Sequence, residues 1–323
     1  MSNATFGAAE MRPEPIVYLV GPTASGKKRI ALALKDRLEA ELLALDSMKV
    51  FRGMELGTDK ASRHRFALTD LVGPSESFSV GEYVRAAKSA VCEIRGRGRF
   101  PFFVGGTGLY LRALVRGLFE GPDIPFELRN HVRERLQRWG PQAGHDRLRR
   151  IDPCSAIRIH PNDLKRLGRA LEVFEATGRP LSVWQREHTV QPISGIPILV
   201  GVRWSSEVLR RRIEERVDSM LERGLIEEVR RICAVGAIGS VAAEAIGYRE
   251  ALAVLSGIMN LQECRRKIVL STWRLARRQH TWFRQFPEIV WLEGEKHSEE
   301  KLVSKAFQAI ESALRPLRSA QQT

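Results

Sequence analysis

Residues 16–28 read IVYLVGPTASGKK, and this stretch decides the fold. Its first five residues are apolar and predict a strand of a buried parallel sheet. The next eight fit the pattern G-x-x-x-x-G-K and are Gly21, Pro22, Thr23, Ala24, Ser25, Gly26, Lys27 and Lys28. In such a loop the backbone N–H groups and the lysine face phosphate oxygens, and the next helix directs the positive end of its dipole there. The stretch therefore predicts a strand, a phosphate-binding loop and a helix, in that order.

The last residue of this loop departs from the pattern. A serine or threonine hydroxyl normally binds Mg²⁺ at that position, whereas residue 28 is a lysine. An ammonium group repels a metal ion. Three interpretations stay open: Lys28 itself neutralises the phosphates, the metal binds through water and substrate oxygens, or the site has lost activity. We expect Mg²⁺ as a cofactor, at a site that Lys28 weakens.

Further apolar runs along the chain predict the remaining strands. Two of them are followed at once by polar residues, Asp46 in one case and Thr107 of a Gly-Gly-Thr turn in the other. Strands that alternate with helices indicate a parallel α/β sheet, and ligands of such sheets bind beyond the carboxyl ends of the strands. The runs lie at 42–45, 100–104, 196–202 and 289–292, and we expect long helices at 207–232 and 261–283 and one polar helix after 293.

The region 123–189 differs from the rest, because it has no convincing strand and several amphipathic helical patterns. We interpret it as an all-helical insertion in a P-loop α/β core. The predicted organisation is a disordered lead-in at 1–15, a core made of 16–122 and 190–323, and the helical insertion at 123–189.

Composition limits the class of protein. The chain has 52 Lys and Arg against 38 Asp and Glu, a net charge of +14, which suits a phosphate-rich partner. Its four cysteines have no metal-binding spacing, and no apolar run is long enough to span a membrane. We expect a cytoplasmic monomer with no membrane partner.

Five blocks resemble the tRNA dimethylallyltransferases, also called isopentenyltransferases. They are LDSMKVFRGMELGT (45–58), GGTGLYLRAL (105–114), HPNDLKRLGRALEVFEATGRPLS (160–182), EAIGYRE (244–250) and ARRQHTWFR (276–284). The resemblance implies transfer of a dimethylallyl group from dimethylallyl diphosphate to N6 of the adenosine next to the anticodon, in tRNAs that read codons beginning with U.

The resemblance also assigns roles to residues. Asp46 is the expected base for the N6 proton, with Lys27 and Thr107 as the other catalytic residues; Asp46 as a magnesium ligand and Thr107 as a turn residue are the alternatives. The residues 21–28 bind the diphosphate. The anticodon stem-loop is expected to contact Asp46, Ser47, Met48, Lys49, Lys165, Arg166, Leu167, Gly168, Arg169, Arg249, Arg274, Arg277, Arg278 and Gln279.

Several polar positions depart from the family. Besides Lys28 for threonine, they are Lys49 for glutamine, Phe66-Ala67 for a His-His pair, Ser206 and Trp273 for arginines, and Glu244 for glutamine. Three alternatives therefore accompany the transferase: a divergent tRNA-binding paralogue with weak or no activity, a transferase acting on free AMP, and a P-loop kinase.

Overall fold

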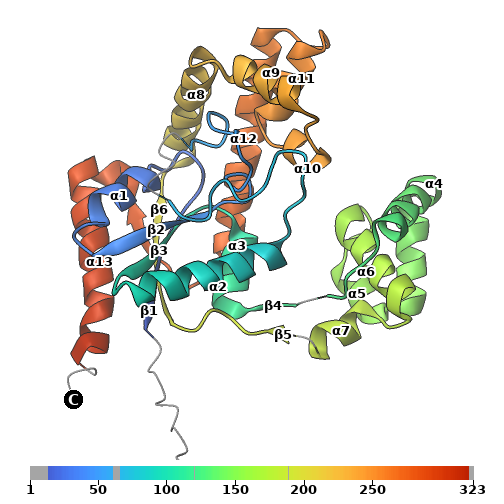
Figure 1. The fold of residues 1–323 in the computed structure, drawn as a ribbon, viewed down its shortest axis with the longest axis horizontal. Helices are drawn as coiled ribbons and strands as arrows, with labels where there is room; N and C mark the ends of the chain where they lie inside the picture. Colours follow the sequence, from blue (N-terminus) through green and yellow to red (C-terminus); the bar gives the residue numbers. More distant parts are fainter. Residues whose placement is uncertain (1–13, 61–65, 120, 188, 320–323) are drawn as a thin grey trace, which may run out of the picture. The chain divides into compact units, whose positions relative to one another are not determined.

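The computed structural model describes residues 14–60, 66–119, 121–187 and 189–319. Its main sheet has five parallel strands in the order β2-β3-β1-β6-β7, which confirms the predicted α/β class (Figure 1). The predicted apolar runs correspond to the strands β1 (Pro15–Val20), β2 (Ala40–Leu45), β3 (Phe100–Gly105), β6 (Ile196–Arg203) and β7 (Val290–Glu293).

The register of the sheet brings three strand ends level with one another. Gly105 at the end of β3 pairs with Val20 of β1 on one side and with Leu45 of β2 on the other. The segments that leave these strands are therefore the phosphate loop, the loop that begins with Asp46 and the Gly-Gly-Thr turn. This edge of the sheet gathers the residues that the sequence singles out.

Two helices from opposite ends of the chain share one core with the sheet. The helix α1 (Lys27–Leu34) packs against α13 (Glu299–Ser319), and Leu34 and Ile310 are both fully buried there. The helix predicted after 293 is present, but it is amphipathic and not polar, because an apolar stripe of α13 covers the core. On β3 packs α2 (Val80–Gly96), whose Tyr83 hydroxyl donates to the carbonyl of Ala44.

A second core lies among the helices that follow β6. The single helix expected at 207–232 is two helices, because Gly224 adopts a left-handed conformation (φ +92°) that ends the first one. The helix expected at 261–283 is confirmed by α12. The helices of this region are α8 (Ser206–Glu222), α9 (Leu225–Val235), α10 (Ser240–Ala243), α11 (Tyr248–Leu255) and α12 (Leu261–Phe283), and α3 (Gly108–Arg116) follows β3.

Residues 116–192 form a compact unit of their own, and the rest of the chain forms the other. Its core is apolar, with Leu148, Leu167 and Leu171 almost fully buried. It contains α4 (Phe126–Ile151), kinked at Gly140-Pro141, then α5 (Pro153–Arg158), α6 (Leu164–Thr177) and α7 (Leu181–Glu187), with a small sheet of β4 (Leu118–Phe119) and β5 (Thr189–Val190).

The predicted disordered lead-in lies outside the described residues except for its last two positions, of which Pro15 already belongs to β1. No helix within the described ranges is long and apolar enough to cross a membrane. The four cysteines are free.

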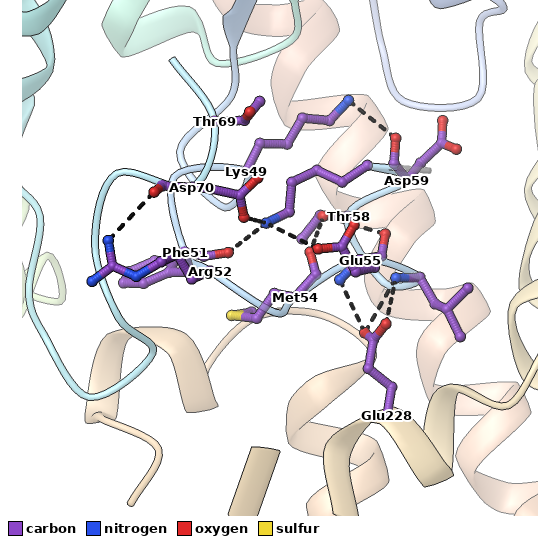
Figure 2. A network of polar contacts seen from close by, with 12 residues as sticks. Lys49, Phe51, Arg52, Met54, Glu55, Thr58, Asp59, Thr69, Asp70 and Glu228 are labelled. Atoms are coloured by element: carbon purple, nitrogen blue, oxygen red, sulfur yellow. Dashed lines mark hydrogen bonds and ion pairs between the residues drawn. The ribbon is translucent and has the colours of Figure 1, made fainter. Parts of the chain in front are cut away.

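The loop after β2 is held by two buried charged side chains (Figure 2). The carboxylate of Glu228 accepts hydrogen bonds from the backbone N–H groups of Glu55 and Leu56 and from the hydroxyl of Tyr248. Burial and the neighbouring Glu228 raise the pKa of Tyr248 well above its ordinary value. The ammonium of Lys60 donates to the carbonyl of Phe51 and pairs with Asp70 at 2.7 Å. These contacts fix the part of the loop that carries Lys49 and Asp59.

We predict that Glu228→Ala lowers the free energy of unfolding by about 3 kcal/mol, because it leaves buried donors without an acceptor. Denaturant unfolding measures the change. The neighbouring Glu227 is exposed and pairs with Arg230, so Glu227→Ala is the matched control and should cost less than about 1 kcal/mol. Equal losses in the two variants would contradict the buried role of Glu228.

Candidate functional site

A cavity of about 550 Å³ opens at the carboxyl edge of the sheet. It contains both features that the sequence predicts there, the phosphate loop and Asp46. Besides residues 23–29, the lining includes Asp46, Lys49, Asp59, Phe66, Gly105, Gly106, Arg212, Arg216, Arg223 and Gln279.

The phosphate loop has the backbone shape that anion binding requires. Gly26 precedes α1 in a left-handed conformation (φ +85°), and Ala24 adopts a similar one (φ +62°). The N–H groups at the start of a helix have no partner within that helix, so those of Lys27 and Lys28 are available to an anion at the positive end of the dipole.

Side chains from distant segments hold the carbonyl side of this loop. The indole of Trp204 donates to the carbonyl of Ser25 at 3.0 Å. The guanidinium of Arg212 donates to the carbonyl of Ala24 at 2.8 Å and lies over the Trp204 ring. With the carbonyls bound behind the loop, its N–H groups stay turned toward the cavity.

Gln279 of α12 joins the phosphate loop to the Gly-Gly-Thr turn. Its side-chain oxygen accepts from the N–H of Thr23 at 2.8 Å, and its nitrogen donates to the carbonyl of Gly106 at 3.0 Å. A Cβ at position 106 would lie 2.3 Å from that nitrogen, so a larger residue there would displace the Gln279 amide from this hydrogen bond. Because the Thr23 N–H already donates to Gln279, it is not available to a diphosphate oxygen. The RNA contact predicted for Gln279 stays a prediction.

Asp46 reaches the cavity directly from the end of β2. One oxygen of its carboxylate accepts from the N–H of Met48 at 2.8 Å, and within the described ranges its second oxygen has no hydrogen-bond donor. Thr107 is not among the cavity-lining residues; its hydroxyl accepts from the N–H of Ser47 at 3.1 Å. Thr107 therefore fixes the backbone next to Asp46, and the catalytic roles predicted for both residues stay predictions.

Lys27 lies folded against its own loop, where its ammonium donates to the carbonyl of Pro22 at 2.7 Å. Burial, together with the nearby charges of Arg216 and Lys49, lowers the pKa of Lys27 to about 7, against opposing effects of Asp46 and Asp59. Lys27 is thus partly neutral at neutral pH, and a bound anion would favour its charged form.

Three cationic side chains contact Asp59. Lys28 approaches its carboxylate at 3.2 Å and Arg216 at 3.8 Å, while Lys49 donates to its carbonyl at 3.3 Å. Burial alone would raise the pKa of Asp59, but the charges of Arg216, Lys28 and Lys49 hold it below its ordinary value. The carboxylate stays ionised and is fully engaged by positive groups.

The side chains of this cavity do not fit a protein-held Mg²⁺ site. Such a site needs oxygen ligands, but residue 28 offers an ammonium and Asp59 is paired with cations. Across the described ranges no group of three or more His, Cys, Asp or Glu residues is arranged to hold a metal. In the part of the chain that the structure describes, Asp46 keeps one free carboxylate oxygen in the cavity, but the hydroxyl that the loop pattern normally supplies is absent and Asp59 is taken by cations, so the expected metal lacks the protein ligand that the pattern provides.

The predicted RNA-contacting arginines of α12 lie on its exposed side. Arg274 and Arg277 line a groove of about 510 Å³ with the half-buried Trp273. Arg278 is also exposed, whereas Arg249 forms ion pairs with Glu244 and Glu250. The remaining members of this groove are Arg210, Glu214, Arg265, Arg266, Val269 and Leu270.

In the helical unit the predicted residues divide into two groups. Lys165 and Arg166 are exposed at the start of α6, which Asp163 caps by accepting from the N–H of Arg166. Leu167 is fully buried, and Gly168 is buried beside it, so the RNA contact predicted for the Leu167 side chain is wrong. Arg169 donates to the carbonyl of Pro122 and pairs with Glu172, which gives it a structural role within the unit.

Sequence reasoning missed the four cavity arginines, of which Arg212 and Arg216 contact the phosphate loop or Asp59. It expected an arginine in place of Ser206, but the guanidinium groups come from Arg212 and Arg216, further along α8. The signal was present: the two residues are four apart and each precedes a buried position, Ile213 or Val217.

The fold and this cavity define a P-loop protein that binds a phosphate-bearing ligand beside a carboxylate. The chain belongs to the IPP transferase family, whose model matches residues 49–286. It is 41% identical to the tRNA dimethylallyltransferase of Geobacter metallireducens and 43% identical to tRNA dimethylallyltransferase 1 of Pelobacter propionicus. Each alignment covers 86% of this chain and 92% of the relative. The crystal structure of the full-length tRNA isopentenylpyrophosphate transferase of Bacillus halodurans is also similar, with a TM-score of 0.70 and 34% identity over 96% of this chain and all of that one.

We predict that one lysine of the protein titrates near pH 7 without ligand, and that pyrophosphate moves its pKa upward by favouring the charged form. NMR titration of ¹³C-labelled lysine side chains measures both values, and the signal should be missing from Lys27→Arg. If every lysine titrates near the ordinary value of about 10.4, the buried environment assigned to Lys27 is wrong.

Proposed function

We propose that this chain transfers a dimethylallyl group from dimethylallyl diphosphate to N6 of the adenosine next to the anticodon, in tRNAs that read codons beginning with U. One observation carries the proposal: the phosphate loop and Asp46 line the same cavity. Its relatives are named tRNA dimethylallyltransferases, and the similarity extends over most of both chains.

The nucleophile in this reaction needs help from a base. The lone pair of an aryl amine is delocalised into the ring, so N6 attacks well only as its proton is removed. Asp46 accepts that proton through the carboxylate oxygen that Met48 does not occupy. As the proton leaves, N6 forms a bond to the first carbon of the dimethylallyl group, and the bond from that carbon to the diphosphate oxygen breaks.

The leaving group needs an environment that accepts negative charge. An allylic carbon separates readily from its diphosphate, so stabilising the departing anion lowers the barrier directly. The N–H groups at the start of α1, the ammonium of Lys27 and the guanidinium of Arg216 supply that environment. Because Trp204, Arg212 and Gln279 hold the loop in advance, little reorganisation accompanies the reaction.

The adenosine must leave its stack to reach this cavity, which costs least in a single-stranded loop. The exposed cations Lys165 and Arg166 of the helical unit and the arginines of α12 are the groups assigned to the RNA backbone. A monomeric, cytoplasmic enzyme suits this substrate, and both points stay predictions.

We predict that Asp46→Asn lowers single-turnover transfer to an anticodon stem-loop by about 10³-fold, because the amide cannot accept the proton. The affinity for the RNA should change little. Asp36→Asn, at an aspartate paired with Lys35 outside the cavity, is the control and should transfer normally. Transfer retained by Asp46→Asn would remove the base assignment.

We also predict that Lys165→Ala combined with Arg166→Ala weakens tRNA binding and reduces the slope of log K against log salt by about two. Filter binding across a salt series measures it. Two lysines of α13, Lys301 and Lys305, give the matched double-alanine control. A salt slope identical to that of the unmodified chain would take the helical unit out of the RNA-binding surface.

A further inference from the structure

The position where P-loop proteins carry a metal-binding hydroxyl holds an ammonium group in this chain. Lys28 lies in the first turn of α1 and lines the cavity. It donates to the carbonyl of Asp59 at 3.1 Å and to its carboxylate at 3.2 Å, and its side chain keeps 24% of its exposure. The charge is thus at the phosphate site and still reachable from the cavity.

The partner of Lys28 is held in place by its own backbone and by other cations. Asp59 adopts a left-handed conformation (φ +57°) at the end of the segment that Glu228 fixes. Lys49, the second departure from the family's polar residues, donates to the same carbonyl and lies over the ring of Phe66. The two lysines therefore form one arrangement around Asp59, and neither is an isolated surface residue.

The charge of the cavity is strongly positive without any metal. Among the residues that the structure describes, seven basic and three acidic side chains line it, an excess of four basic groups, and of the basic groups Lys27 is partly neutral. A diphosphate ester is a polyanion, so it neutralises this excess. A divalent cation entering at the same place would meet Lys28, Lys49 and Arg216 around Asp59 and be repelled.

We propose that this chain binds the diphosphate of its substrate without a divalent cation, with the Lys28 ammonium in the place of the metal. This inference rests on the proposed function. Asp59 holds Lys28 when the site is empty, and the flexible lysine stem lets the ammonium turn from that carboxylate to a phosphate oxygen when substrate arrives. Charge-assisted hydrogen bonds from ammonium to phosphate then replace metal coordination.

Calorimetric binding of inorganic pyrophosphate to the full chain tests this directly. We expect the unmodified chain to bind at least as tightly in EDTA as in Mg²⁺, because the metal competes with the protein for the anion. Lys28→Thr should bind roughly tenfold more weakly in EDTA, the loss of one charge-assisted contact, and recover in Mg²⁺. Lys28→Arg should keep its binding in EDTA, and Lys35→Thr, at the C-cap of the same helix and outside the cavity, is the control.

The outcomes separate this inference from the function on which it rests. If the unmodified chain binds pyrophosphate in Mg²⁺ but roughly tenfold more weakly or not at all in EDTA, the role of Lys28 is wrong and the transferase proposal stands. If Lys28→Thr binds in EDTA as well as the unmodified chain does, the role of Lys28 is also wrong. Absence of pyrophosphate binding in both buffers would instead contradict the transferase proposal itself.

Discussion

Concentrated positive charge in a partly closed cavity is the constraint on which this structure depends. Like charges held together repel one another, so the cavity needs internal compensation. Asp59 supplies it, since its carboxylate pairs with Lys28 and Arg216. Burial, and after it the charges of Arg216 and Lys49, also lower the pKa of Lys27. Both arrangements are reversible, which leaves the cations ready for an anionic substrate.

The rest of the core serves to keep this charge in position. Three side chains from distant parts of the sequence, Trp204, Arg212 and Gln279, bind the backbone of the phosphate loop from behind. The helices that carry Arg212 and Gln279 belong to the second hydrophobic core, which also buries the loop after β2. Packing of α8 and α12 is therefore coupled to the geometry of the diphosphate site.

Local patterns explain which parts could be predicted from the sequence. The strands, the phosphate loop and α12 follow from apolar periodicity and from glycine chemistry within a few residues. The role of Gln279 could not be predicted in this way, because its partner Thr23 is 256 positions away. Asp59 belongs to no recognised motif. Its role in pairing with the cavity cations depends on its left-handed backbone and on Lys28 and Arg216, which come from two other segments. The break at Gly224 was readable as a helix-ending glycine, but the apolar stripe on both sides favoured one helix.

The central claim is that one cavity holds the diphosphate and the reacting adenine side by side. A crystal structure of the chain with an anticodon stem-loop and a dimethylallyl diphosphate analogue, in which sulfur replaces the bridging oxygen, tests it most directly. The account predicts the diphosphate on the N–H groups that open α1 and the adenine N6 within hydrogen-bond distance of the Asp46 carboxylate. An adenine bound away from Asp46, or a diphosphate bound outside the loop of residues 21–28, would contradict it.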